Sequence, residues 1–427
     1  MLDVLPTAWI FFSAAAVLTL AAVHVSRGRS PLGQGLVGLG LILVLNWFGF
    51  GTQGVRAQQA VAGREVISVG PKKAIKTMAQ ASKIAKAGAL IEVDSGEYAG
   101  DVAVWTQENL TLRAVGGRVR LLAAGAAAEG KAIWVIRGGG VSVDGFDFIG
   151  ARVPDQNGAG IRFEKGKLVV RNCSFTDNEN GILAGNHHDA ELDIENSEFG
   201  RNGHGDGQSH NLYVGAIARL SITGSYFHHA NVGHLLKSRA RLNHIFYNRF
   251  TDESGGRASY ELEFANGGLA YVVGNIVQQG TQTENRHLIS YGTEGYKWPK
   301  NELYLINNTL LNGSPHGGVF LRVRHGKVTV KAFNNLLVGA GKLESAGPGD
   351  YRSNFTVGRN DFELADAESY RLKRGSALLG RVVEPGSANG TDLQPRAEYA
   401  HRANSRAIIG KFQNPGALQT THPQPRR

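Results

Sequence analysis

Cysteine is nearly absent from this sequence. The 427-residue chain has one cysteine, Cys173, and only two methionines. A single cysteine excludes an internal disulfide framework and any metal site built from several thiolates. Cys173 lies in the strand-like stretch VVRNCSF, so we interpret it as a small core residue. A metal-loading function is disfavoured as well, because such a protein would gather Cys, Met or His residues.

A helical period is also absent from the body of the chain, where no ten-residue amphipathic pattern separates the strand-like runs. Short alternating runs such as LVVRNCSF and LYLINNTL are instead separated by Gly, Asn and Asp turns, which is typical of strands. An apolar anchor closes each unit, with gaps of 24, 28, 23, 27, 33 and 27 residues between successive anchors. The anchors are Phe175, Phe199, Phe227, Phe250, Val277, Leu310 and Leu337. Repeats of this length predict a solenoid whose coils bury their apolar faces against one another.

Asparagine recurs just before the anchors, at Asn172, Asn196, Asn248, Asn275, Asn307 and Asn334. Asparagine tolerates the left-handed backbone of a tight turn, and its amide can hydrogen-bond along a stack. We therefore expect these side chains to stack at one corner of a parallel β-helix.

The first 60 residues have a different composition. Two apolar runs, 8–24 and 36–50, flank a short loop that contains Arg27 and Arg29. Each run is slightly shorter than the ~20 residues that span a bilayer. We predict two transmembrane helices, and the positive-inside rule then puts the body of the chain on the periplasmic or extracellular side of the inner membrane. A cleaved signal peptide ending near Val55-Arg56-Ala57 is the alternative.

The formal net charge is +10, so the chain has an excess of basic residues. No cluster of aromatic and basic residues typical of a nucleic-acid module is present, so we expect no nucleic-acid partner. For an exported body, this charge favours an acidic polysaccharide as partner, while an ordinary solvated surface stays an alternative.

The entry segment ISVGPKKAIKTMAQASKIAKAGALIEVDSGEYAGDVAV resembles the start of pectate-lyase-like right-handed parallel β-helix proteins. In that family an amphipathic helix, here residues 73–87, caps the open end, and GALIEVDSGEY corresponds to the first coil. The exit YRLKRGSALLG resembles a closing coil. The resemblance covers residues 64–412 and implies an all-β solenoid, but not one activity, since this fold carries lyases, hydrolases, epimerases and non-enzymes.

Four strand-like segments can be stacked on successive coils: SHNLYVG, GHLLKSR, SYELEFA and RHLISYG. Their spacing is nearly regular if four leucines form one inward column: Leu212, Leu236, Leu262 and Leu288. Because side chains alternate across a strand, three outward columns follow. They are Asn211–Leu235–Glu261–His287, Tyr213–Lys237–Glu263–Ile289 and Gly215–Arg239–Ala265–Tyr291.

Lys237 decides the register of this stack. A slip of one residue would bury it beside Val214 and Phe264, and an unpaired buried ammonium costs several kcal/mol. The sequence therefore predicts that Lys237 points outward, one rung of ~4.8 Å from Glu263 and from Tyr213.

Ionisable and aromatic residues gather on these coils. The candidate catalytic residues are Lys237, Arg239, His287 and Tyr291. The candidate substrate-binding residues are Tyr213, His210, His234, Glu261, Glu263 and Trp298. Loops GRNGHGDGQSH and YGTEGYKWPKN are expected to wall a groove. The alternative is an exposed salt-bridge ladder that pairs Lys237 with Glu263 and Arg239 with Glu261.

β-Elimination from a uronic acid needs a base for the C5 proton, a cation for the adjacent carboxylate and an acid for the leaving oxygen. The run LKS followed by YNRF resembles β-helix lyases that cleave alginate and dermatan sulfate, and this resemblance implies that Lys237 is the base. Arg239 would clamp the carboxylate or act as the acid, and His287 and Tyr291 are further candidate proton donors. Where those lyases have Leu-Arg-His-Gly, this chain has Phe264-Ala265-Asn266-Gly267, so their arginine acid is missing.

The same relatives use Ca²⁺, which implies a possible calcium site. Glu261, Glu263 and Asn211 have the hard oxygen atoms that Ca²⁺ prefers, and they are the candidate ligands. The loop residues His204, Asp206 and His210 are an alternative divalent-ion site.

The sequence thus predicts a membrane anchor (1–60), a right-handed parallel β-helix (61–412) and a disordered basic tail (413–427). The expected function is a lyase or C5-epimerase acting on an acidic polysaccharide. Two alternatives stay open: a non-catalytic polysaccharide-binding or envelope-assembly protein, and a glycoside hydrolase that uses Glu261 and Glu263.

Overall fold

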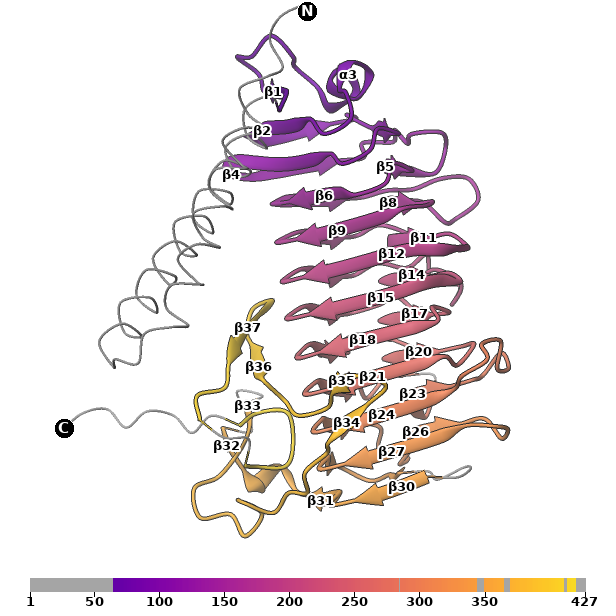
Figure 1. The fold of residues 1–427 in the computed structure, drawn as a ribbon, viewed down its shortest axis with the longest axis vertical. Coiled ribbons are helices and arrows are strands. Elements are labelled where there is room, and N and C mark those ends of the chain that lie inside the picture. The colour runs from indigo at the N-terminus through magenta and orange to yellow at the C-terminus, as the bar shows by residue number, and fades with distance from the viewer. Residues whose placement is uncertain (1–63, 284, 344–348, 365–368, 411–412, 420–427) are drawn as a thin grey trace, which may run out of the picture. The chain divides into compact units, whose positions relative to one another are not determined.

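Parallel strands stacked in coils form the body of the chain in the computed structural model (Figure 1). The structure describes residues 64–283, 285–343, 349–364, 369–410 and 413–419. The coils make a right-handed β-solenoid of about 10 turns. The expected all-β parallel β-helix is therefore confirmed. The predicted transmembrane helices lie outside the described residues, and none of the helices that the structure describes is long and apolar enough to span a membrane.

Each complete coil contributes one strand to each of three parallel runs. The run that carries the candidate site is a 10-stranded sheet: β3 (Ala103–Trp105), β5 (Ala132–Ile136), β8 (Ala159–Phe163), β11 (Asn180–Ala184), β14 (Leu212–Val214), β17 (Leu236–Ser238), β20 (Leu262–Phe264), β23 (His287–Tyr291), β26 (Val319–Val323) and β29 (Lys342–Leu343).

The other two runs belong to a 21-stranded sheet. The first consists of β1 (Val66–Val69), β2 (Leu90–Ala99), β4 (Thr111–Leu122), β6 (Val141–Asp144), β9 (Lys167–Arg171), β12 (His187–Glu195), β15 (Ile217–Thr223), β18 (Leu242–Phe246), β21 (Leu269–Val273), β24 (Glu302–Ile306), β27 (Thr329–Phe333) and β30 (Gly349–Arg352). The second consists of β7 (Phe146–Ile149), β10 (Ser174–Thr176), β13 (Glu198–Gly200), β16 (Tyr226–His228), β19 (Arg249–Thr251), β22 (Ile276–Gln279), β25 (Thr309–Asn312), β28 (Leu336–Val338) and β31 (Phe355–Val357).

The apolar anchors form one column inside the solenoid. Each predicted anchor pairs with the next, from Phe175 on β10 to Leu337 on β28. The rings of Phe148, Phe175, Phe199, Phe227 and Phe250 stack with centroids 4.6–4.9 Å apart. The repeat predicted from these anchors is therefore confirmed, and burial of this column holds successive coils in register.

The asparagines that were expected to stack at one corner form two neighbouring columns. Asn172, Asn196, Asn307 and Asn334 adopt positive φ angles of 48–59° at the tight turn. One position further along, the amides of Asn248, Asn275, Asn308, Asn335 and Asn354 hydrogen-bond from coil to coil, and the first four of them are buried. The prediction merged the two columns because some coils have Asn at only one of the positions.

The N-terminal cap is shorter than the expected helix over residues 73–87. Helix α3 spans Met78–Ile84, and the Thr77 side chain accepts a hydrogen bond from the Gln80 amide at its start. The Asp101 carboxylate accepts from the amides of Met78 and Ala79 at 2.7 and 3.0 Å. These acceptors satisfy the first free amides of the helix and fix where it begins.

The C-terminal segment does not close the solenoid as one more coil. It contains the short helix η1 (Arg359–Asp361) and three antiparallel pairs: β32 (Phe362–Leu364) with β33 (Ser369–Leu372), β34 (Ser387–Ala388) with β35 (Thr391–Asp392), and β36 (Ala397–Ala400) with β37 (Asn404–Ala407). Tyr370, Tyr399 and Ala417 pack in one cluster with Tyr226 and Leu336 of the solenoid. Residues 413–419, expected as part of a disordered tail, are therefore packed, and residues 420–427 lie outside the described residues.

Candidate functional site

Three outward side chains on adjacent coils carry the candidate site. Strand β14 pairs with β17 and β17 with β20, so that Leu212, Leu236 and Leu262 form the predicted inward column. The next position is the outward column Tyr213–Lys237–Glu263. Lys237 therefore points away from the core, and its neighbours stand one rung of ~4.8 Å away on either side.

The ammonium of Lys237 lies between two carboxylates. Its Nζ atom is 3.1 Å from Glu263 Oε2 and 3.1 Å from Glu294 Oε1. The predicted Lys237–Glu263 pair is present, whereas the predicted partner of Arg239, Glu261, is replaced by Glu294. The Arg239 guanidinium donates two hydrogen bonds to the Glu294 carboxylate, each at 2.7 Å. We call Lys237, Arg239, Glu263 and Glu294 the lysine cluster.

Both carboxyl groups of the lysine cluster are held in the ionised form. Burial opposes ionisation of Glu263, but His234, Lys237 and a 2.5 Å hydrogen bond from Thr293 outweigh it and keep the pKa well below its usual range. Burial likewise opposes ionisation of Glu294, and hydrogen bonds from Arg239 and Lys237 lower its pKa. The cluster therefore contains two cations and two anions.

Tyr213 stands on the other side of Lys237 and contacts Arg239. The Arg239 Nη1 atom donates a hydrogen bond to the phenol oxygen. The guanidinium carbon also lies 5.0 Å from the centre of the tyrosine ring. Arg239 thus connects the phenol of Tyr213 with the carboxylate of Glu294.

Two buried histidines, His210 and His234, contact the column Tyr213–Lys237–Glu263. Burial lowers the pKa of His210 well below its usual value, so the ring is neutral at physiological pH. Its Nδ1 atom accepts a hydrogen bond of 2.9 Å from the His234 amide, which leaves the proton on Nε2. The His210 ring stacks on Tyr213 with centroids 5.7 Å apart, and His234 Nε2 lies 3.1 Å from Glu263 Oε2.

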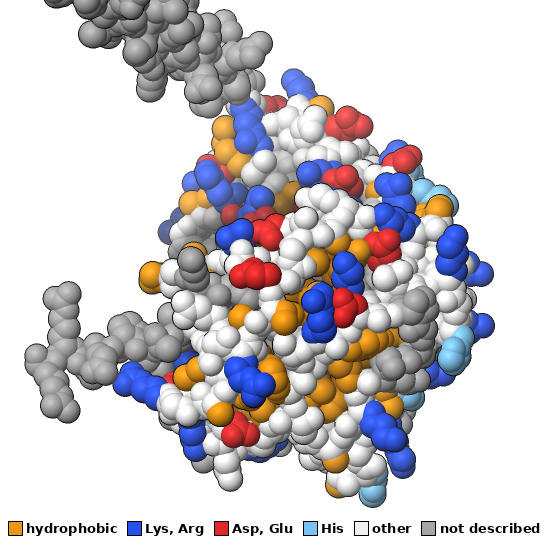
Figure 2. Space-filling view, turned by 60° about the horizontal axis from the view of Figure 1, so that its bottom comes forward, with side chains coloured by type: hydrophobic (Ala, Val, Ile, Leu, Met, Phe, Trp, Pro, Cys, Tyr) orange, Lys and Arg blue, Asp and Glu red, His pale blue; other side chains and the backbone are white. Residues whose placement is uncertain are grey.

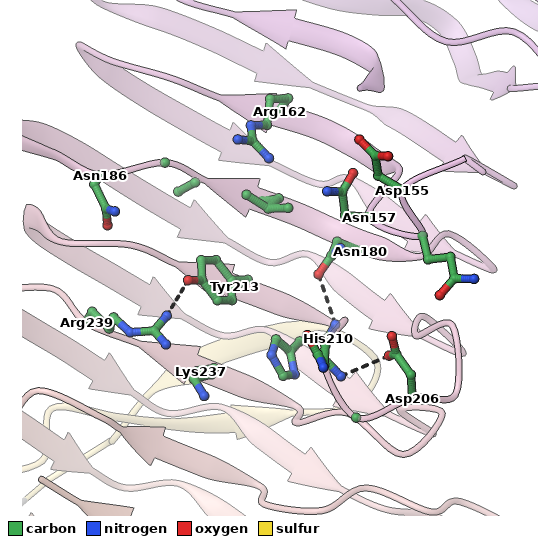
Figure 3. A pocket seen from close by; sticks show the side chains of 16 residues that line it. Asp155, Asn157, Arg162, Asn180, Asn186, Asp206, His210, Tyr213, Lys237 and Arg239 are labelled. Atoms are coloured by element: carbon green, nitrogen blue, oxygen red, sulfur yellow. Dashed lines mark hydrogen bonds between the residues drawn. The ribbon is translucent and has the colours of Figure 1, made fainter. Parts of the chain in front are cut away.

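A groove of about 590 Å³ opens in front of these residues (Figure 3). It is lined by Asp155, Gln156, Asn157, Arg162, Asn180, Leu183, Ala184, Gly185, Asn186, Asp206, Gly207, Gln208, His210, Tyr213, Lys237 and Arg239. Figure 3 shows Arg162, Tyr213, Lys237 and Arg239 along the strands, with Asp155 and Asp206 on the loops at one end. The predicted loop GRNGHGDGQSH walls the groove through Asp206, Gly207 and Gln208.

Arg162 is a cation of the groove that forms no ion pair within the described part of the chain. It pairs with Leu183, which pairs with Tyr213, so Arg162 lies two rungs from Tyr213 in the same outward column. Among the described residues, no ion pair involves Arg162, and its buried Nε atom has no hydrogen-bond partner. Lys237 and Arg239, in contrast, are both paired with glutamates.

On the coil of β23 the pairing is displaced by one residue from the predicted columns, so the predictions for Tyr291 and His287 are wrong. Leu262 pairs with Ile289 instead of Leu288, because the connection from β20 to β23 is one residue longer than a regular spacing requires. Ser290 therefore continues the outward column, and Tyr291 faces the core, where its phenol donates to the Gly268 carbonyl. His287 bonds to Asn285 at 2.7 Å and does not line the groove.

Glu261 and Asn211 also differ from the prediction. Each residue precedes the first residue of its strand, so the alternation of the strand does not extend to it, and both side chains are fully buried. Leu235 holds the equivalent place on β17 and belongs to the main hydrophobic core. The Asn211 amide accepts a 2.8 Å hydrogen bond from Asn202 and donates one to the His228 carbonyl.

The predicted calcium ligands are consequently not brought together. Glu261 and Asn211 face the interior, while Glu263 faces outward and lies against Lys237 and His234. Within the described part of the chain, no three His, Cys, Asp or Glu side chains are arranged to hold a metal ion. His204 instead lies 3.5 Å from Glu179, and Asp206 accepts from the Gln208 amide. These donor sets do not fit Ca²⁺.

Trp298 belongs to a neighbouring recess. Its indole Nε1 donates to the Arg239 carbonyl at 3.1 Å, and its ring lines an apolar hollow of about 300 Å³ with Leu242, Leu269 and Pro299. It supports the backbone of Arg239 but does not line the groove. The loop YGTEGYKWPKN therefore contributes through Glu294, which no sequence pattern singled out.

The positive net charge is not gathered into one patch on the face shown in Figure 2. Lys and Arg side chains are spread over that face, with Asp and Glu among them.

No family model and no curated protein matches this chain. Among solved structures it is similar to pectate lyase Pel9A, with a TM-score of 0.59 and 13% identity over 84% of this chain and 97% of that one. The PL6 family polysaccharide lyase Pedsa3628 from Pseudopedobacter saltans matches at TM-score 0.31 and 11% identity (73% and 97% covered). A pectin methylesterase from Aspergillus niger matches at TM-score 0.30 and 11% identity (73% and 91% covered). The chain thus has the pectate-lyase-like right-handed parallel β-helix fold.

The buried carboxyl of Glu261 generates a stability prediction. Burial, with the charge of Asp252 added, raises its pKa well above the usual value, and neither oxygen has a hydrogen-bond partner among the described residues. A carboxyl with a raised folded-state pKa contributes stability that is present below its unfolded pKa of about 4.3 and is lost as the pH rises. Glu261→Gln should therefore stabilise the protein at pH 7, by about 2–3 kcal/mol, which is at the low end of the cost of an unpaired buried charge, and by much less at pH 4.

Urea unfolding of Glu261→Gln at both pH values measures this difference. The exposed Glu384→Gln is the matched control and should change the free energy of unfolding by less than about 0.5 kcal/mol at either pH. Equal or lower stability of Glu261→Gln at pH 7 would show that the buried carboxyl is compensated.

Proposed function

We propose that this β-helix acts on an acidic polysaccharide in the groove, by removing the C5 proton of a uronic acid, as a lyase or as a C5-epimerase. The main support for the proposal is that one groove contains three suitable side chains. Tyr213 and Lys237 can transfer protons, and the guanidinium of Arg162 forms no ion pair with the described residues. The fold shared with a pectate lyase is compatible with this function and does not by itself select it.

Arg162 supports an acidic substrate. The carboxylate next to C5 must be neutralised for the proton to leave, and an arginine binds a carboxylate with two parallel hydrogen bonds. Arg239 is less suited to this task than the sequence indicated, because its donors already contact Glu294 and Tyr213. Arg162 lies on the same face of the strands and is available to a uronate bound across two rungs.

Binding without turnover is the second candidate function. It is favoured by the balance of charges in the lysine cluster, since two cations and two carboxylates that satisfy one another also describe a structural network. A hydrolase that uses Glu261 and Glu263 lacks such support, because these carboxyl groups face opposite sides of the strand.

Product analysis separates these functions. Residues 61–427 should be incubated with alginate, polygalacturonate and glycosaminoglycans, with and without a chelator. A lyase forms an unsaturated end that absorbs in the ultraviolet, an epimerase exchanges C5 hydrogen with D₂O without cleavage, and a binder only retards the glycan on an affinity gel. We expect absorbance or exchange from the wild-type protein, and Lys237→Ala should lower formation of the ultraviolet-absorbing end by about 10²-fold or more. Unchanged formation of that end in Lys237→Ala, with Lys297→Ala as control, would contradict the proposal.

The role proposed for Arg162 predicts an effect on kcat/KM. Arg162→Gln removes a charge-assisted contact worth about 1.5–3 kcal/mol, so kcat/KM for the acidic glycan should fall about 10- to 100-fold. Arg152→Gln, at an exposed position outside the groove lining, is the control. An unchanged kcat/KM would exclude Arg162 from contact with the substrate carboxylate.

We also propose that residues 1–60 anchor the chain in the inner membrane, with the β-helix on the periplasmic or extracellular side. The two apolar runs and the arginines between them support this topology. The full chain should stay in the membrane fraction after an alkaline wash, while residues 61–427 should be released. Release of the full chain would contradict the anchor.

A further inference from the structure

We infer that Tyr213 is the base that removes the C5 proton and that Lys237 is the acid that protonates the leaving oxygen. This inference rests on the proposed function and deepens it. It reverses the role that sequence resemblance implies for Lys237, and three observations carry it: the two carboxylates at Lys237, the guanidinium at Tyr213, and the position of both side chains on adjacent rungs of the groove.

The surroundings of Lys237 suit a proton donor. A lysine removes a proton only as the neutral amine, whereas an ion pair with a carboxylate is made by the ammonium. Lys237 Nζ lies 3.1 Å from one carboxylate oxygen of Glu263 and 3.1 Å from one of Glu294. Both contacts are ion pairs of the kind that an ammonium makes with a carboxylate, so this geometry suits a residue that gives a proton.

The surroundings of Tyr213 suit a proton acceptor. A tyrosine that removes a proton reacts through its phenol oxygen, and a cation that donates a hydrogen bond to that oxygen stabilises the negative charge that it carries during the reaction. Arg239 makes this contact through Nη1, and Glu294 holds the guanidinium in place with two hydrogen bonds of 2.7 Å. No carboxylate contacts the phenol oxygen among the described residues. Arg239 acts here as a positioning residue, because it contacts Tyr213.

The spacing of the two groups fits one sugar ring. Tyr213 and Lys237 are paired residues on β14 and β17, so their side chains leave the sheet ~4.8 Å apart and on the same face. The C5 hydrogen and the O4 leaving oxygen are carried by adjacent ring carbons. A uronate bound across these two strands therefore meets the phenol at C5 and the ammonium at O4.

The reaction balances with these two residues alone. The phenolate oxygen of Tyr213 takes the C5 proton, and the electron pair of the C5–H bond becomes the second bond between C4 and C5. The C4–O4 bond breaks, and O4 takes a proton from the Lys237 ammonium. The enzyme then holds a phenol and a neutral amine, and proton exchange with solvent restores the starting forms. No oxidant or further reactant is required.

The two roles are separated by two measurements on two variants, made with polygalacturonate and alginate in D₂O. Lys237→Gln keeps the base, so it should still exchange the C5 hydrogen while formation of the ultraviolet-absorbing end falls at least about 10²-fold. Tyr213→Phe removes only the phenol oxygen and should lose both exchange and elimination by at least about 10²-fold. Tyr296→Phe and Lys297→Gln, whose side chains do not line the groove, should retain both.

Loss of C5 exchange in Lys237→Gln, alone or together with Tyr213→Phe, would overturn the assignment, as would exchange that persists in Tyr213→Phe. Thermal unfolding of each variant separates these results from misfolding. If the wild-type protein shows neither absorbance nor exchange with any acidic glycan, the proposed function itself fails, which is a different result from a reversal of roles.

Discussion

Parallel hydrogen bonding between successive coils is the constraint on which the site depends. Each strand of the groove face pairs with the same position of the strand before it, so residues about 25 positions apart become neighbours at ~4.8 Å. The phenylalanine stack and the asparagine ladder hold this register from inside. If β17 were displaced by one residue, Lys237 would leave the outer face and its ammonium would point into the core.

The electrostatic arrangement follows from that register. Lys237 and Glu263 meet because they are paired residues, and the loop after β23 adds Glu294 to both Lys237 and Arg239. One of the remaining donors of the guanidinium contacts the phenol of Tyr213. The result is a column in which a proton-donating group and a proton-accepting group stand side by side. Arg162, which forms no ion pair with the described residues, lies two rungs from Tyr213.

Much of the fold was predictable because its signals repeat. The anchor column from Phe175 to Leu337 and the outward direction of Lys237 required only the alternation of strands and a repeat length. The wrong predictions concern residues to which the alternation of side chains along a strand does not apply. Glu261 and Asn211 sit one residue before a strand, Tyr291 follows a connection that is one residue longer than regular, and Glu294 lies on a loop. Arg162 shares an outward column with Tyr213, but that column alone does not show that Arg162 lacks a carboxylate partner.

A crystal structure of the Tyr213→Phe variant with a bound acidic oligosaccharide tests the central claim most directly. The account predicts a uronate in the groove, its carboxylate on Arg162 or on the adjacent backbone, C5 toward residue 213 and the glycosidic oxygen toward Lys237 Nζ. An oligosaccharide whose C5 faces Lys237, or one that binds outside the groove, would contradict it.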